Sequence, residues 1–231
     1  MDHTHTKYMT LEVFNFCNIK SFPIDCFSII KEYGLEAVSY SSLYDGLKNY
    51  CLMYSDDAFK YKNLICYNDD RPNGRVRFSL MHELAHILLG HQGDHTSAQE
   101  QDANFFASNV LAPRMAIHYA GCKNQSDVSK LFHITDEAAH YAFADYRRWY
   151  RRTVYYKMNS FDKAMYSHFY SKEQDKFVYS IKRCAYCGDE IYNSRMHICP
   201  KCNRHNYNFF QNVTYDTDLL IAENQWLYGG L

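Results

Sequence analysis

Two histidines and a glutamate in the segment His-Glu-Leu-Ala-His, residues 82–86, have the types and spacing that bind zinc and activate water. His82 and His86 are four residues apart, so on a helix their rings lie on the same face and can bind one Zn2+. Glu83 then lies beside the open coordination position, where it can act as general base toward a metal-bound water. This H-E-x-x-H pattern predicts a catalytic metal site.

The residues that flank this motif favour a buried helix. Between positions 78 and 90 every side chain is apolar except Ser79 and the three motif residues, and Gly90 suits the helix C-cap. Unpaired imidazoles and a carboxylate would be costly there, because a buried polar group needs a partner. A bound metal supplies that partner, so we prefer it to the alternative of a chance motif on a solvated helix.

A catalytic zinc site needs a third protein ligand and one open position. The candidates downstream are His91, His95, Glu100 and Asp102. A second helix is predicted from Ser97, which would be its N-cap with Glu100 as the capping-box partner. Asp102 has no such role and lies at the edge of the apolar face, so we prefer it as the ligand and keep Glu100 as the alternative. The metzincin spacing is excluded, because Leu89 and Gln92 stand where it requires glycine and histidine.

Residues 20–115 resemble the ImmA/IrrE family of metallopeptidases. The resemblance begins with Phe-Pro-Ile-Asp at 22–25 and continues through the strand at 64–68 into the H-E-x-x-H helix. The segment over 99–113 is similar to a second family motif, usually written E-A-N-x-F-A-x-x-L-L-x-P.

The resemblance implies a thermolysin-like zinc peptidase. His82 and His86 would be metal ligands, Glu83 the base, and the acidic residue before Ala103 the third ligand. That residue is Asp102, whereas the family usually has glutamate. Because an aspartate side chain is one methylene shorter, the second helix must lie closer to the metal or coordination weakens.

Two C-x-x-C pairs near the C-terminus, separated by eleven residues, predict a structural zinc ribbon. Its ligands would be Cys184, Cys187, Cys199 and Cys202. A ribbon of this size has too small a core to fold alone, so metal binding and folding should be coupled. The alternatives are unligated thiols or a redox dithiol. The ribbon could bind the protein substrate, bind nucleic acid, or only cap the fold.

Residues 126–139 resemble a helix-turn-helix, with Thr135 as the N-cap of its second helix. That helix begins with Asp136 and Glu137, which would face DNA phosphates unfavourably, and its arginines at 147–152 lie at the far end. We therefore prefer a packing module behind the catalytic part and keep DNA binding open.

The pattern of elements predicts an α+β fold. A small antiparallel or mixed sheet, with strands at 35–40 and 64–67, would pack on the H-E-x-x-H helix and on a second metal-ligand helix over 97–112. We expect a zincin-like domain at 1–116, a helix-turn-helix-like unit with a basic linker at 117–180, and the ribbon with a C-terminal tail at 181–231.

The composition fits a cytoplasmic protein. The 231 residues carry a formal net charge of −1, and no apolar run is long enough to span a membrane. The N-terminal residues lack the basic start and apolar core of a signal peptide. Nine cysteines, five of them scattered singly, suit reduced thiols better than disulfides.

The predicted function is that of a zinc metalloendopeptidase with one catalytic and one structural Zn2+. The resemblance implies cleavage of a helix-turn-helix repressor of a phage or mobile element, and hence derepression of transcription. No membrane partner is expected, and nucleic acid would be a secondary partner. The alternative is a DNA-binding or antitoxin-like regulator with a vestigial zinc site. The sequence leaves the cleavage site and the oligomeric state open, together with the residue that supports the oxyanion, for which His118, Tyr119, His133 and His140 are candidates.

Overall fold

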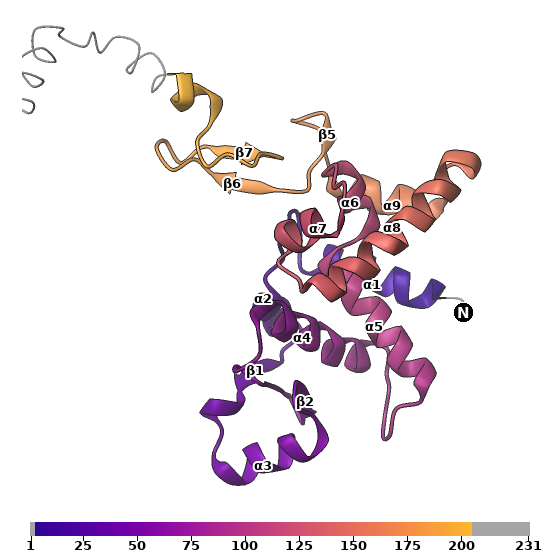
Figure 1. Ribbon diagram of the computed structural model, residues 1–231, viewed down its shortest axis with the longest axis vertical. Helices are drawn as coiled ribbons and strands as arrows, with labels where there is room; N and C mark the ends of the chain where they lie inside the picture. Colours follow the sequence, from indigo (N-terminus) through magenta and orange to yellow (C-terminus); the bar gives the residue numbers. More distant parts are fainter. Residues whose placement is uncertain (1–2, 205–231) are drawn as a thin grey trace, which may run out of the picture. The chain divides into compact units, whose positions relative to one another are not determined.

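The computed structural model describes residues 3–204, apart from the side chains of 154–156. The chain divides into two compact units, residues 1–181 and 182–231. The first half of the first unit contains α1 (Thr4–Phe16), α2 (Cys26–Glu32), β1 (Glu36–Ser39), the 3-10 helix η1 (Tyr40–Ser42), α3 (Asp45–Tyr54), β2 (Ala58–Tyr61), β3 (Leu64–Tyr67) and α4 (Asn73–Leu88). It continues with α5 (Ser97–Leu111), α6 (Arg114–Tyr119), α7 (Gln125–Phe132), α8 (Asp136–Tyr156), α9 (Ser160–Phe169), β4 (Tyr170–Ser171) and β5 (Lys176–Phe177) (Figure 1). The second unit holds β7 (Glu190–Tyr192), which pairs with β6 (Ile181–Arg183).

A mixed three-stranded sheet lies beside the helix that carries the motif. Its strand order is β1-β3-β2, with β1 parallel and β2 antiparallel to β3. β2 is the last strand in this order, so among the described residues it forms an edge of the sheet. It pairs with β3 on one side, where Lys60 lies opposite Ile65. The predicted α+β class is confirmed, and the sheet is of the mixed kind.

α4 lies between this sheet and α5, and it contacts β2 and β3 as well as α5. Its buried face consists of Leu80, Met81, Leu84 and Ala85. α5 contributes Ala103, Phe106, Ala107 and Val110 to the same core. Because these side chains have no exposed surface, hydrophobic burial fixes the two helices against each other independently of any metal.

The turn between α7 and α8 packs tightly on the first turn of α4. A Cβ atom on Gly74 would lie 2.8 Å from the backbone nitrogen of Thr135 and 2.9 Å from the carbonyl carbon of Ile134, so only glycine fits there. The buried Arg77 donates hydrogen bonds to the carbonyl oxygens of Ile24, at 2.7 Å, and Phe132, at 3.4 Å. These contacts support the role of a packing module that was preferred from the sequence.

One hydrophobic core extends across position 116, the predicted domain boundary. It includes Leu80 and Phe106 on one side and Phe132 and Trp149 on the other. The three-part domain division stays a prediction.

The N-terminal segment, which the sequence left unassigned, contributes α1. This helix packs on α5 and α9, with Val13 and Phe14 fully buried. Of the helices in residues 3–204, none is both long and apolar enough to cross a membrane.

Candidate metal centre and catalytic site

The two motif histidines face one another on α4. Their Nε2 atoms are 3.0 Å apart, and the side chains are largely buried, with exposed fractions of 17% for His82 and 4% for His86. Burial lowers the pKa of His82, and burial together with the neighbouring histidines lowers that of His86 to about 3. Both rings are therefore neutral at pH 7 and can use a nitrogen lone pair as a metal ligand.

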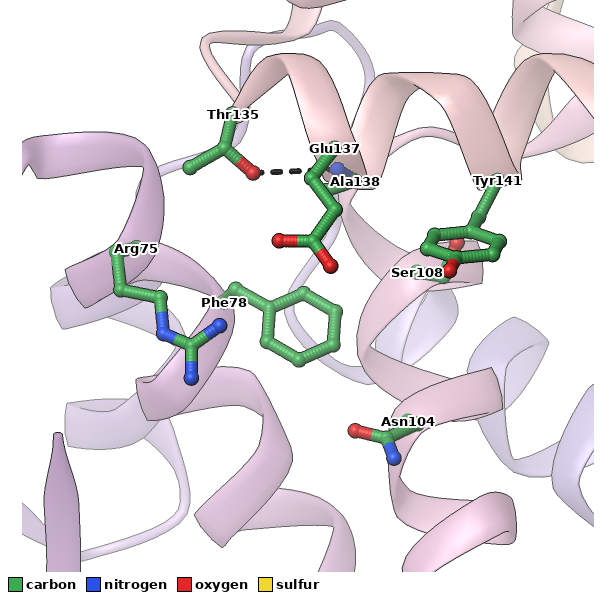
Figure 2. A pocket seen from close by; sticks show the side chains of 8 residues that line it. All are labelled: Arg75, Phe78, Asn104, Ser108, Thr135, Glu137, Ala138 and Tyr141. Carbon is green, nitrogen blue, oxygen red and sulfur yellow. Dashed lines mark hydrogen bonds between the residues drawn. The ribbon is translucent and has the colours of Figure 1, made fainter.

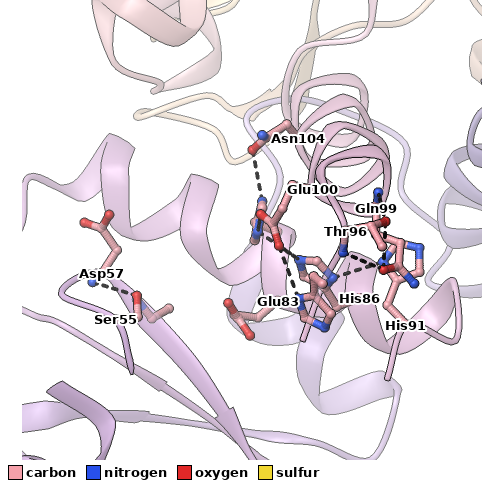
Figure 3. A network of polar contacts seen from close by, with 12 residues as sticks. Ser55, Asp57, Glu83, His86, His91, Thr96, Gln99, Glu100 and Asn104 are labelled. Atoms are coloured by element: carbon pink, nitrogen blue, oxygen red, sulfur yellow. Dashed lines mark hydrogen bonds and ion pairs between the residues drawn. The ribbon is translucent and has the colours of Figure 1, made fainter. Parts of the chain in front are cut away.

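Glu100 from α5 completes this cluster, as Figure 3 shows. Its Oε2 is 3.2 Å from Nε2 of His82, and its Oε1 is 3.4 Å from Nε2 of His86. In a tetrahedral zinc site with bonds of about 2.0–2.1 Å, the ligand atoms lie about 3.3 Å from one another. The spacing and the donor set of two imidazoles and a carboxylate therefore fit a zinc ion.

The structure does not bring Asp102, the ligand preferred from the sequence, to this cluster. Its Oδ1 accepts hydrogen bonds from Nδ1 of His3, at 2.7 Å, and from Oγ1 of Thr6, at 3.2 Å, both on the α1 side of α5. Two residues along a helix correspond to a rotation of about 200°, so the side chains of Glu100 and Asp102 leave α5 in nearly opposite directions. Asp102 therefore joins α5 to the N-terminal segment.

The preference for Asp102 arose from a capping box placed one residue too late. The N-cap of α5 is Thr96, not Ser97, and its reciprocal partner is Gln99. The Thr96 backbone N–H donates to Oε1 of Gln99 at 2.8 Å, while the Gln99 N–H donates to Oγ1 of Thr96 at 3.3 Å. Glu100 therefore has no capping role, and its carboxylate is free to face the histidines.

Asn104 orients His82 from the next turn of α5. Nδ1 of His82 and Oδ1 of Asn104 are 3.0 Å apart. Because a carbonyl oxygen only accepts, the ring must donate from Nδ1, which leaves the Nε2 lone pair for a metal. The sequence analysis missed this residue, although its i, i+4 spacing from Glu100 was a usable signal.

His91 and His95 support the other side of the cluster. Gly90, with φ of 71°, follows the end of α4 and turns the chain back toward this helix. Nδ1 of His91 therefore lies 3.0 Å from Nδ1 of His86. The ring of His95 stacks on His86 at a centroid distance of 3.7 Å, and its Nδ1 is 3.2 Å from Oε1 of Glu100. The sequence analysis named His91 and His95 only as possible third ligands and did not predict these contacts with His86.

Glu83 lies in the same pocket, of about 260 Å3, as His82 and Glu100. Its Oε2 accepts a hydrogen bond of 3.1 Å from the backbone N–H of Lys60 on β2. Burial raises the pKa of Glu83 to about 7, and the nearby Glu100 charge acts in the same direction, whereas the Lys60 hydrogen bond opposes it. A carboxyl group that titrates near neutral pH is suited to general base catalysis.

None of the four candidates for oxyanion support lines this pocket in the part of the chain that the structure describes. His118 contacts Tyr146, with Nδ1 and the phenolic oxygen 3.5 Å apart, and His140 is 3.1 Å from Gln125. His133 is the exposed left-handed cap of α7, and Tyr119 stacks on Phe177. This assignment stays open.

The second unit brings the sulfur atoms of Cys184, Cys187, Cys199 and Cys202 together. The Sγ atoms of Cys187 and Cys199 are 3.6 Å apart, near the roughly 3.8 Å expected between ligands of a tetrahedral zinc with 2.3 Å bonds. Hydrogen bonds from the backbone N–H groups of Cys187 and Cys199 lower the pKa of Cys184 to about 6, which favours the thiolate. The donor set fits a structural zinc ion.

Residues 45–144 match the family model of the IrrE N-terminal-like domain, Peptidase_M78. This match confirms the resemblance over those residues and supports a metallopeptidase-like function.

No curated protein matches the chain. Among solved structures, the fold is similar to that of a Mycobacterium tuberculosis transcriptional regulator, with 12% identity and a TM-score of 0.43. That match covers 84% of this chain and 57% of the other, so the chain spans little more than half the length of the regulator.

Proposed function

We propose that the protein is a zinc-dependent endopeptidase in which His82, His86 and Glu100 hold the metal and Glu83 is the general base. The observation that carries this proposal is the meeting of three ligand atoms from two helices at 3.0–3.4 Å, beside a buried carboxyl group. A zinc ion bound there would lower the pKa of a water molecule and polarise the scissile carbonyl group.

The residues of this chain would then do three things. Glu83, held through its Oε2 by the N–H of Lys60, takes the proton of the attacking water and later passes it to the leaving amine. Asn104 keeps the proton of His82 on Nδ1. The edge strand β2 gives an extended substrate segment a backbone to pair with, next to Glu83.

The family resemblance supports a more specific substrate, a helix-turn-helix repressor of a phage or mobile element whose cleavage derepresses transcription. The free thiols of all nine cysteines suit a reducing compartment such as the cytoplasm.

The rival function, a DNA-binding or antitoxin-like regulator, requires that the second helix of a helix-turn-helix enter a DNA groove by its N-terminal end. In this protein that end of α8 begins at Asp136, one residue after Thr135, which lies against Gly74 of α4. The packing therefore favours the peptidase.

Replacement of Glu83 by Gln tests the mechanism. The variant should keep the zinc content of the wild type, because Glu83 is not a ligand, and should lose cleavage of a co-expressed repressor by at least about 100-fold. Metal analysis by mass spectrometry and an immunoblot of the repressor measure the two effects. Cleavage at the wild-type rate would exclude Glu83 as the base.

A further inference from the structure

A second pocket, of about 370 Å3, opens beside the candidate metal site. Three helices build it with pairs of residues about one turn apart: Arg75 and Phe78 from α4, Asn104 and Ser108 from α5, and Glu137 and Tyr141 from α8, as Figure 2 shows. Arg75, Phe78 and Asn104 also line the pocket that contains Glu83. The two cavities are therefore neighbours with a shared wall.

The pocket is close enough to receive the substrate side chain next to the scissile bond. The ring centroid of Phe78 is 6.3 Å from that of His82, and Asn104 contacts His82 directly at 3.0 Å. A side chain of a peptide bound at the metal site would enter this pocket beside these two residues. The pocket is also large enough to hold a side chain, because its volume of about 370 Å3 exceeds the roughly 300 Å3 of the smallest small-molecule pockets.

The pocket is lined by one basic and one acidic residue, Arg75 and Glu137. The guanidinium group of Arg75 is paired with Asp57 at 2.6 Å, and Asp57 also contacts Arg71 at 3.3 Å. Glu137 is exposed and forms no hydrogen bond or ion pair with any described residue, although its charge acts on Arg75, and Figure 2 shows its carboxylate pointing toward Phe78. It lies in the first turn of α8, where a negative side chain complements the helix dipole.

We propose that this pocket is a specificity subsite for a lysine or arginine side chain of the substrate, adjacent to the scissile bond. This inference rests on the proposed peptidase function. The methylene groups of the substrate side chain pack on Phe78 and Ala138, while the cationic end meets the carboxylate of Glu137 and the face of Tyr141. Arg75 is held by Asp57 at 2.6 Å, which leaves the Glu137 carboxylate without a direct ion pair to it.

Two short peptide hydroxamates test the proposal without knowledge of the natural substrate. One carries lysine and the other norleucine at the position beside the zinc-binding group, so that they share an apolar stem and differ in charge. Calorimetry with the zinc-loaded full-length protein should give about fivefold to tenfold tighter binding of the lysine compound, the size expected of a partly exposed ion pair.

Glu137→Gln should remove this preference and leave the affinity for the norleucine compound unchanged. The matched control is Asp136→Asn, which removes the same charge from the adjacent residue, exposed like Glu137 but outside the pocket lining, and it should retain the preference. Equal binding of the two compounds by the wild type, or a preference that survives Glu137→Gln, would overturn the subsite while the peptidase function stands. If neither compound binds the zinc-loaded protein, the proposal of an open metal site is contradicted, and the proposal of the subsite falls with it.

Discussion

The two candidate metal sites of this protein are built in opposite ways. In the ribbon all four ligands come from a stretch of 19 residues, 184–202, around a small core of Cys184, Ile191 and Cys199. In the catalytic site two helices bring the ligands together, and an extensive hydrophobic core fixes those helices first. We therefore expect the ribbon to need its metal in order to fold, whereas the candidate catalytic site is formed by the fold and should persist without metal.

The largest effect is expected on removal of the ribbon metal. Cys184→Ser should unfold residues 182–204, because structural zinc contributes about 10–16 kcal/mol of folding free energy to modules of this kind. Hydrogen exchange should show loss of protection in the ribbon and unchanged protection in α4 and α5. His82→Asn is the matched control in the other site, and it should leave both helices protected. If α4 loses its protection in that variant, the catalytic site also depends on metal for its structure.

The next largest effect distinguishes the roles of two acidic residues of α5, Glu100 and Asp102. Glu100→Gln should weaken zinc binding at the catalytic site by more than about 100-fold, since it removes a charged ligand, a larger loss than removal of a supporting residue. Asp102→Asn should leave the affinity nearly unchanged and lower the melting temperature slightly, because it weakens the contacts with His3 and Thr6. Zinc titration against a chelating indicator measures both. The reverse pattern would restore Asp102 as the ligand.

A smaller effect is expected from the residue that orients His82. Asn104→Ala should reduce zinc affinity by about 10- to 100-fold, as is usual when a hydrogen bond to a ligating histidine is lost. Asn104→Asp should restore most of the affinity, because a carboxylate also accepts from Nδ1. Asn109 provides the control on the same helix, because its side chain donates to the Phe105 carbonyl oxygen at 2.8 Å and not to a motif histidine, and Asn109→Ala should have no effect on zinc.

The smallest effect is on the pH dependence of stability of the metal-free protein. The pKa of His86 is lowered to about 3, so this residue costs stability as the pH falls below 6.5, with a limiting slope of about 1.4 kcal/mol per pH unit. The pKa of Glu83 is raised to about 7, so its burial costs stability as the pH rises from 4.5 toward 7. Between pH 4.5 and 6.5 the two slopes oppose each other.

Glu83→Gln should therefore remove the opposing contribution and leave the pH dependence of stability that is due to His86. Urea unfolding at several pH values should show a stability that falls more steeply from pH 6.5 to 4.5 in the variant than in the wild type. Parallel curves for the two proteins would show that Glu83 is not buried as described.

The sequence predicted those parts of the sites that depend on local spacing. Residues four apart on one helix, such as His82 and His86, must share a face, and two C-x-x-C turns must each present two thiolates. It failed for Asp102, whose partners His3 and Thr6 are nearly a hundred residues earlier in the chain. It also did not predict the contact of His91 with His86, because the direction of the chain after Gly90 depends on one left-handed residue.

The sequence by itself therefore determined the α+β class and which residue types are candidates for zinc binding, because these follow from short-range geometry and from hydrophobic periodicity. Only the tertiary structure decided which acidic residue of α5 meets the histidines and which packs on α1. That choice depends on the rotation of α5 about its own axis, which is fixed by the burial of Ala103, Phe106 and Val110 against α4 and the rest of the core. A rotation of this kind leaves no signature in residue spacing when acidic side chains occur on both faces of the helix.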